Sequence, residues 1–139
     1  MNLVIIDGQG GQLGAQLIKE ITATFKDIEL TAIGTNSAAT SAMLKAGAKK
    51  GATGENPVVV ACRKAEVIMG PVGIVIADSL LGEITEGMAL AVARADAIRI
   101  LIPMNKCENL VAGVQNGNMG ALIADALSKL RAVIDEKSS

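Results

Sequence analysis

The fold is decided by the stretch Leu3-Val4-Ile5-Ile6-Asp7-Gly8-Gln9-Gly10-Gly11-Gln12-Leu13-Gly14 near the start of the chain. Residues 3–6 form a continuous β-rich apolar run, which predicts a strand covered on both faces, as in a parallel sheet. From Leu13 to Phe25 the apolar residues recur at helical spacing, with charged residues between them. The sequence therefore predicts a buried strand, a glycine-rich turn and an amphipathic helix in direct succession.

Strand and helix signals continue to alternate along the chain. Further strands are predicted at residues 28–33, 66–69 and 98–102, and further helices at 37–46, 85–95 and 122–135. Alternating strands and helices favour parallel strands joined by right-handed crossovers. We therefore expect an α/β fold in which residues 1–139 form a single domain around a doubly wound, mainly parallel sheet.

Two internal segments give mixed signals. Glycines and lysines predict a loop at 47–55, and Asn56 followed by Pro57 is a typical helix start. The valines at 58–60 argue against that helix. Residues 74–77 are apolar and form either a further strand or a buried crossing segment.

The last part of the chain carries two weaker expectations. Residues 110–114 could return beside the strand at 98–102 as a short hairpin partner. The polar residues 136–139 are expected to fray.

The composition excludes several classes of function. The chain has 13 basic and 14 acidic residues, a net charge of -1, one Phe, and neither Trp nor Tyr. Nucleic acid is a poor candidate partner, because the chain offers neither a basic stripe nor aromatic platforms for stacking. Histidine is absent, which nearly excludes a Ser-His-Asp arrangement and most zinc sites. We expect no metal site of that kind.

Other bulk properties bear on location and assembly. No segment reaches the roughly 18 consecutive apolar residues of a membrane span, and the start lacks a signal sequence, so we expect a cytoplasmic protein that does not enter membranes. With 139 residues of which 50% are hydrophobic, the chain is expected to form a homo-oligomer, most simply a two-fold dimer. Cys62 and Cys107 are interpreted as reduced thiols, Cys62 in the core.

The glycine turn is the strongest functional signal. Its spacing fits G-x-x-G-x-x-G better than G-x-G-x-x-G, whose third glycine would fall at Leu13. The turn precedes a helix N-terminus, where exposed amides and the helix dipole can hold a nucleotide phosphate. The residues expected to contact it are Gly8, Gln9, Gly10, Gly11, Gln12, Leu13 and Gly14. The alternative is that the glycines only make a tight connection between strand and helix.

The end of the second predicted strand bears on which nucleotide is bound. An acidic residue there would accept the ribose hydroxyl of NAD, but Thr35, Asn36 and Ser37 occupy the place. NADP is therefore the first ligand to consider, although NADP sites usually add an Arg. The same three residues could instead cap the next helix. Gly70 and Pro71, at the end of the third predicted strand, complete the candidate cofactor contacts.

Polar residues after the later strands are candidates for catalysis. Asp78 and Glu83 could act as general acid and base or as Mg²⁺ ligands, or could instead cap the helix at 85–95. Lys106 could hold a phosphate or a substrate carboxylate, or be a solvated turn residue. Cys107 could be a nucleophile, but the chain has no histidine to activate the thiol.

A further signal comes from five segments: 6–11 (IDGQGG), 34–37 (GTNS), 51–56 (GATGEN), 70–85 (GPVGIVIADSLLGEIT) and 102–107 (IPMNKC). Together they resemble a family of small bacterial proteins, domain of unknown function 3842, over nearly the whole chain. The resemblance implies a Rossmann-like fold and brings no established activity, so it assigns no residue a role. The glycine spacing alone also resembles that of extended short-chain dehydrogenases and some small NADP-dependent reductases.

These observations favour a nucleotide-binding protein, with a phosphate-containing small molecule as its ligand. If the protein is an enzyme, its simplest form is a small oxidoreductase. The alternative is a non-catalytic oligomeric sensor or accessory module that binds a nucleotide or another small anion. A nucleotide-dependent transferase is a third reading, made weaker by the lack of a G-K-[ST] phosphate loop.

Overall fold

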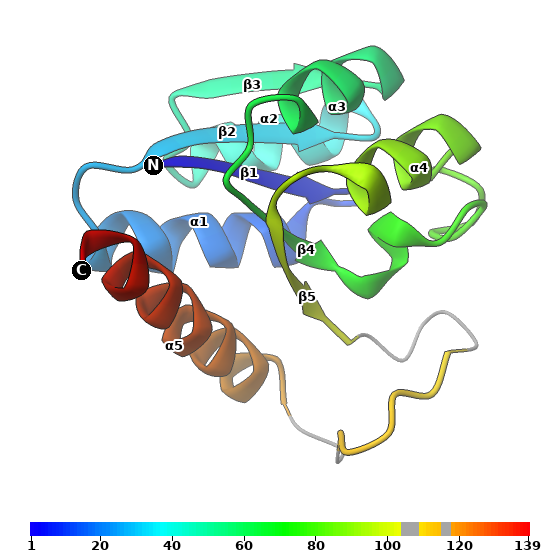
Figure 1. Ribbon diagram of the computed structural model, residues 1–139. Coiled ribbons are helices and arrows are strands. Elements are labelled where there is room, and N and C mark those ends of the chain that lie inside the picture. Colours follow the sequence, from blue (N-terminus) through cyan, green and yellow to red (C-terminus); the bar gives the residue numbers. More distant parts are fainter. Residues whose placement is uncertain (104–108, 115–117) are drawn as a thin grey trace.

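The computed structural model describes residues 1–103, 109–114 and 118–139, which are organised around a five-stranded sheet (Figure 1). The strand order is β3-β2-β1-β4-β5 and every neighbouring pair is parallel. The strands are β1 (Asn2–Asp7), β2 (Glu29–Gly34), β3 (Lys50–Thr53), β4 (Val67–Pro71) and β5 (Ile98–Ile102). The predicted Rossmann-like α/β fold is confirmed. Because the chain steps outward from β1 in opposite directions, the switch point lies between β1 and β4.

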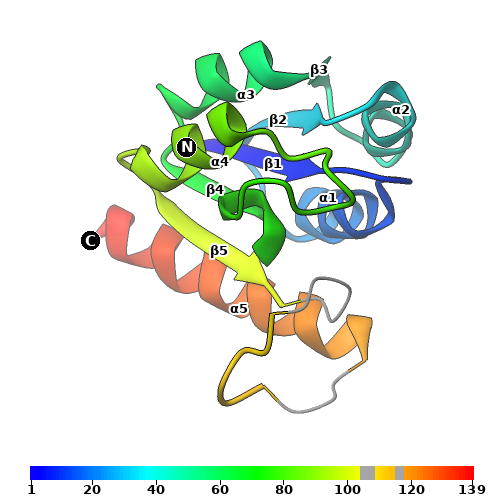
Figure 2. The same ribbon diagram turned by 90° about the vertical axis from the view of Figure 1, so that its right-hand side faces the viewer.

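Helices cover both faces of the sheet, as Figures 1 and 2 show. One face packs against α1 (Gln12–Thr24), α2 (Ser37–Lys45) and α5 (Met119–Ser138). The other packs against α3 (Glu55–Cys62), the 3-10 helix η1 (Val72–Val75) and α4 (Glu86–Arg94). Within the described ranges, no helix is long and apolar enough to cross a membrane.

The central strand β1 is buried on both faces, which explains its unbroken apolar run. Leu3 and Ile5 belong to the core cluster under α1 and α5, whereas Val4 and Ile6 belong to the cluster under α3 and α4. All four side chains are at most 4% exposed. Strand alternation therefore divides this one apolar segment between two separate cores.

The segment 47–55 differs from its prediction, because residues 50–53 form strand β3 rather than loop. β3 is an edge strand with mostly exposed residues, so it lacks the apolar pattern by which strands are recognised. Its parallel pairing with β2, from Thr31 opposite Lys50 to Gly34 opposite Thr53, supplies the order that composition does not. A Cβ on Gly51 would lie 2.9 Å from the exposed Leu44 side chain of α2, so β3 and α2 pack closely here.

A helix is confirmed here despite the valines, but its predicted start at Asn56 and Pro57 is wrong: α3 begins at Glu55 after Gly54, and both residues lie in its first turn. Val58 is fully buried while Val60 is 46% exposed, so the run spans the width of a short helix rather than one face of a strand. Residues 74–77 make no strand. Of the two predicted alternatives, the structure has the crossing segment: it begins in η1, where Ile74 is 0% exposed.

The predicted hairpin at 110–114 is wrong, since residues 109–114 form a turn and no strand. Leu110 is 97% exposed there, and β5 pairs only with β4 among the described strands.

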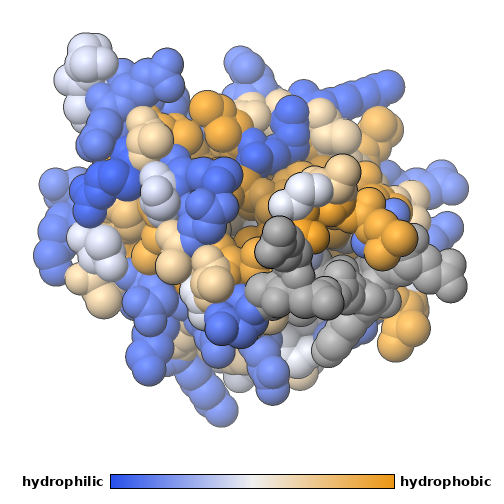
Figure 3. Space-filling model, turned by 90° about the horizontal axis from the view of Figure 1, so that it is seen from below, coloured by the Kyte–Doolittle hydropathy of each residue, from blue (hydrophilic) through white to orange (hydrophobic). Residues whose placement is uncertain are grey.

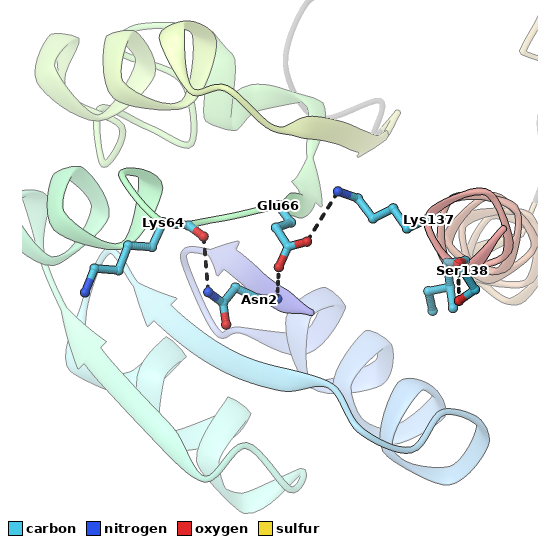
Figure 4. A network of polar contacts seen from close by, with 6 residues as sticks. Asn2, Lys64, Glu66, Lys137 and Ser138 are labelled. Atoms are coloured by element: carbon cyan, nitrogen blue, oxygen red, sulfur yellow. Dashed lines mark hydrogen bonds and ion pairs between the residues drawn. The ribbon is translucent and has the colours of Figure 1, made fainter.

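The last helix is longer than predicted, because α5 continues to Ser138. At the amino end of the sheet, Glu66 Oε1 accepts from the Asn2 amide at 3.0 Å and Glu66 Oε2 accepts from Lys137 Nζ at 3.3 Å (Figure 4). Asn2 Nδ2 in turn donates to the Lys64 carbonyl at 3.3 Å. These exposed contacts join the last turn of α5 to the amino end of the sheet, and the fraying of residues 136–139 stays a prediction.

Candidate functional site

A cleft of about 360 Å³ opens at the carboxyl edge of the sheet, at the switch point between β1 and β4. The loop after β1 forms one wall and the start of η1 the other. Among the described residues that line it, Asp7 is the only charged one. The lining residues are Asp7, Gly8, Gln9, Gly10, Gly11, Gln12, Leu13, Pro71, Val72, Gly73, Leu80 and Met119. This is where ligands bind in open parallel sheets.

Three glycines of the turn are required by packing. Gly11 has a φ of 73°, and a Cβ there would lie 2.7 Å from the Ala39 backbone of α2. A Cβ on Gly14 would lie 2.6 Å from Met43 Sδ, so this glycine lets α1 and α2 approach each other. A Cβ on Gly8 would meet Thr35 Oγ1 at 2.7 Å and Glu83 Oε1 at 2.8 Å. The structural interpretation of the glycine spacing is thus sufficient for these three positions.

Gly10 is different. It is exposed, it is not among the residues with positive φ, and a Cβ built on it would have no protein atom within 4 Å. Nothing inside the described part of the chain therefore requires a glycine at this position, although Gly10 lines the cleft. Close approach of a ligand to the backbone is the remaining physical reason for a missing side chain.

Asp7 fixes the turn from below. Its carboxylate is 5% exposed, and it accepts from the Gly8 amide at 2.8 Å and from the Gly14 amide at 2.7 Å. Burial raises the pKa of Asp7, and the hydrogen bonds from Gly14 and Gly8 only partly oppose that rise. Asp7 therefore joins both ends of the turn, and its two oxygens are engaged by the protein itself.

Glu83 reaches the same turn from the opposite side. Its Oε1 accepts from the Gln9 amide at 2.8 Å, from Thr35 Oγ1 at 2.5 Å and from Asn36 Nδ2 at 2.9 Å. Burial acts to raise the pKa of Glu83, but the three hydrogen bonds, led by that of Thr35, outweigh it and hold the pKa below its usual range. The carboxylate is therefore the charged hub between the glycine turn and the end of β2.

The turn keeps several amides for an external acceptor. The amides of Gly8 and Gln9 donate to Asp7 and Glu83, and that of Gly11 donates to the Gly8 carbonyl at 2.9 Å. No acceptor for the amides of Gly10, Gln12 or Leu13 occurs in the described part of the protein. Gln12 and Leu13 open α1, whose N-terminus has no side-chain cap. These three donors carry the partial positive charge of a helix start and can bind an anion.

The residues after β2 cap helix α2 and also contact the glycine turn. Asn36 caps α2, with Oδ1 accepting from the Ala39 amide at 2.8 Å, and its Nδ2 also donates to the Gln9 carbonyl at 2.9 Å. The predicted cap is confirmed, and Thr35 and Asn36 also lie against the glycine turn. Ser37 is exposed at the start of α2.

Gly70 and Pro71 end strand β4, which runs beside β1. A Cβ on Gly70 would lie 2.3 Å from the Ile6 carbonyl oxygen, so a close approach of the β4 and β1 backbones requires this glycine. Pro71 lines the cleft, whereas Gly70 is buried below it.

Of the four candidate catalytic residues, Asp78 and Glu83 lie within the described part of the chain, on the segment between η1 and α4. The prediction that Asp78 or Glu83 caps α4 is wrong, because Thr85 is the cap, accepting from the Met88 amide at 3.1 Å, and its hydroxyl donates to Glu55. Asp78 is exposed, has a φ of 68°, and its carboxylate has no hydrogen-bond partner among the described residues. Lys106 and Cys107 lie outside the described residues, as does Asn105.

Cys62, the cysteine in the described part of the chain, lies away from the cleft. Cys62 is 5% exposed in the core beside α4, as predicted, and burial raises the pKa of its thiol to about 11. Within residues 1–103, 109–114 and 118–139, no three His, Cys, Asp or Glu side chains come together as a metal ion would require.

Sequence reasoning missed the contact between Glu83 and the residues after β2. Thr35 and Glu83 are 48 positions apart, and no pattern links them. It also missed Leu80 and Met119 as cleft residues, because apolar side chains in connecting segments carry no distinguishing signal.

Comparison with known proteins adds two remote structural likenesses. A dodecameric FMN-dependent UbiX-like decarboxylase from Escherichia coli O157:H7 is 15% identical, with a TM-score of 0.47 over 93% of this chain and 76% of that chain. A nucleoside-diphosphate-sugar epimerase from Pseudomonas aeruginosa is 11% identical, with a TM-score of 0.41 over 94% of this chain and 46% of that one.

Among curated proteins, no match was found. A family model, described as "Domain of unknown function (DUF3842)", matches residues 2–135 and so covers almost all of the sequence. The chain therefore belongs to the family of domain of unknown function 3842.

Proposed function

We propose that the protein binds a nucleotide at the glycine turn, with a phosphate group on the free amides of Gly10, Gln12 and Leu13. The observation that carries this proposal is the combination of these three donors with a cleft at the switch point of the sheet. The cleft, at about 360 Å³, lies at the small end of the range for ligand pockets and suits a phosphate with part of the attached nucleotide. The open space at Gly10 supports close approach of that phosphate.

The rest of the nucleotide is proposed to extend toward Thr35, Asn36 and Ser37. In a sheet with this strand order, the sugar of a bound dinucleotide lies beyond the end of the second strand. NADP is the ligand that the sequence favours, because no acidic residue follows β2 directly. NAD, which differs from it only by the 2′-phosphate, is the matched comparison.

The described residues of the site support ligand binding and leave two candidate functions, a small oxidoreductase and a non-catalytic binding module. Asp7 and Glu83, the two carboxylates at the glycine turn, each accept hydrogen bonds from the protein. Asp78 is exposed, on the strained segment before Glu83. A small oxidoreductase would need catalytic groups beyond these, and a nucleotide-dependent transferase has no further support. We therefore place the non-catalytic sensor or accessory module alongside the oxidoreductase as the second candidate.

A homo-oligomer remains part of the proposal. Figure 3 shows hydrophobic side chains gathered beside the loop that follows β5. The exposed apolar residues in that loop include Leu110 at 97%, Val111 at 42% and Val114 at 43%. Apolar groups that cluster at a surface are typical of contacts between chains. A two-fold dimer is the simplest assembly.

The test is calorimetric titration of the protein with NADP, NAD, ATP and coenzyme A. Gly10→Val should weaken binding of the nucleotide at least tenfold, because its side chain would occupy the space of the phosphate, while the melting temperature stays close to that of the parent. The control is Ala23→Val, which adds a similar side chain at an exposed position near the other end of α1. The proposal fails if none of the four ligands binds, or if Gly10→Val binds as tightly as the control.

A further inference from the structure

We propose that Glu83 makes the site select a nucleotide with a free ribose 2′-hydroxyl over one with a 2′-phosphate, and so NAD over NADP. The inference rests on the proposed nucleotide site and names the residue that reads its sugar. It reverses the preference suggested by the sequence alone, which lacks an acidic residue directly after β2.

The Glu83 carboxylate lies beside the residues that follow β2. Glu83 Oε1 lies 2.5 Å from Thr35 Oγ1 and 2.9 Å from Asn36 Nδ2, both on residues that follow β2. The same oxygen lies 2.8 Å from the Gln9 amide in the glycine turn. In dinucleotide-binding sheets, a carboxylate at the end of the second strand hydrogen-bonds the ribose hydroxyl. Here the connection between η1 and α4 brings a carboxylate to that place from elsewhere in the sequence.

Glu83 has one carboxylate oxygen left to accept a hydrogen bond from a ligand. The three donors converge on Oε1, whereas Oε2 accepts no hydrogen bond from the described residues. The side chain is half-buried, so Oε2 can still be reached from solvent. The lowered pKa of Glu83 keeps the group ionised at neutral pH. An ionised carboxylate only accepts hydrogen bonds, which suits a sugar hydroxyl and not a phosphate.

The described surroundings of Glu83 disfavour a second negative group. No Lys or Arg is among the described residues that line the cleft or hydrogen-bond to Glu83. Asp7 lies below the same turn, and its charge and that of Glu83 repel, which contributes to the raised pKa of Asp7. A 2′-phosphate would add further negative charge with no described cation to balance it. Like charges placed together at an interface are a common means of rejecting the wrong ligand.

The segment that carries Glu83 is held in place by backbone hydrogen bonds and buried side chains. Residues 78–84 are closed by backbone hydrogen bonds from the Asp78 amide to the Ile84 carbonyl at 2.7 Å and from the Ile84 amide to the Ser79 carbonyl at 3.2 Å. Ile84 is fully buried, and Leu80 packs toward Gly8. Three non-glycine residues, Asp78, Leu80 and Leu81, adopt left-handed φ values of 68°, 56° and 55°. Such strain persists where surrounding contacts hold the backbone, so Glu83 is held in place before a ligand arrives.

The experiment measures the dissociation constants of NAD and NADP for the whole protein by calorimetry, at low and at high salt. We expect the parent to bind NAD at least tenfold more tightly than NADP, and the preference to shrink as salt screens the carboxylate. Glu83→Gln keeps the shape and an accepting oxygen, so it should reduce the preference about tenfold, mainly by tightening NADP. Glu86→Gln removes one charge from the exposed first turn of α4 and should leave the preference unchanged.

The outcomes separate this inference from the function on which it rests. Binding of both dinucleotides with equal affinity, or with NADP favoured, overturns the role of Glu83 and leaves the nucleotide site standing. Equal weakening of both ligands by Glu83→Gln assigns the residue to structure alone and also overturns the inference. Binding of neither ligand overturns both. If Glu83→Gln does not fold, the preference of the parent protein and its salt dependence decide the matter.

Discussion

The two ends of the parallel sheet each hold a glutamate whose pKa lies below its usual range, and the two are used differently. At the amino end, the backbone hydrogen bond from Asn2, followed by that of Lys137, lowers the pKa of Glu66 (Figure 4). At the carboxyl end, Glu83 gathers three donors on one oxygen and leaves the other free of described donors. Glu66 joins strand to helix, whereas Glu83 joins the glycine turn to the residues that follow β2.

The difference reflects what surrounds each group. The Glu66 and Lys137 side chains are 40% and 45% exposed, so both lie at the protein surface. The carboxyl end instead contains a buried carboxylate, a glycine with left-handed φ and a strained segment at 78–82. Strain and buried charge cost stability, and they are concentrated at one end of the sheet. The comparison predicts that this end tolerates substitution poorly and that the amino end tolerates it well.

The largest effect is expected for Gly11→Val. A β-branched residue at a φ of 73° is strained, and its Cβ would overlap the Ala39 backbone, so we expect a loss of about 3 kcal/mol or more in the free energy of unfolding. Urea unfolding followed by circular dichroism measures this loss. Gly10→Val, one position away and in open space, is the matched control and should change stability by less than about 1 kcal/mol. Equal losses for the two variants would contradict the packing account of the turn.

The contrast between Gly11 and Gly10 also shows how far the sequence could lead. The strand, the glycine turn and the amphipathic helix were predictable because burial on both faces and helical spacing leave clear local patterns. The spacing of Gly8, Gly11 and Gly14 was visible too, but not its cause. Two helices pack across the turn, which no local pattern encodes, and this packing is sufficient to require glycine at those positions, while their contact with a ligand stays a prediction.

Tertiary contacts account for the features that the sequence did not predict. β3 is ordered by pairing with β2 although its own residues are polar and small. Glu83 reaches Thr35 and Asn36 because the segment after η1 crosses the edge of the sheet. The functional candidates at Lys106 and Cys107 stay predictions. What the sequence did place correctly was the region, since polar residues that follow parallel strands collect at one edge.

An intermediate effect is expected for Asp7→Asn. The carboxylate accepts from two amides in a buried site, whereas an asparagine amide group would face one of these donors with its own N–H. We expect a loss of about 1–3 kcal/mol in unfolding free energy at neutral pH, the usual cost of a buried unpaired donor. Chemical denaturation of both proteins gives the value. A variant as stable as its parent would show that Asp7 does not hold the turn.

The pH dependence of this loss sharpens the comparison between the two ends. Because the folded-state pKa of Asp7 is raised, its protonated form contributes stability at acidic pH, which is lost as pH rises from the ordinary pKa of an aspartate through the raised value. The advantage of the parent over Asp7→Asn should therefore shrink over that interval. An advantage that grows with pH there would mean that the hydrogen bonds outweigh burial.

The smallest effect is expected for Glu66→Gln at the opposite end. Its partner Lys137 is exposed, and exposed ion pairs contribute little and are screened by salt. The variant should melt within a few degrees of the parent, and the difference should decrease in high salt. Because the folded-state pKa of Glu66 is lowered, its contribution is present above the ordinary pKa of a glutamate and is lost as pH falls through the lower value. This dependence is opposite in sign to that of Asp7. Melting curves of Glu66→Gln, Lys137→Met and the double variant would isolate the ion pair, and a large, salt-independent coupling would remove the distinction between the two ends of the sheet.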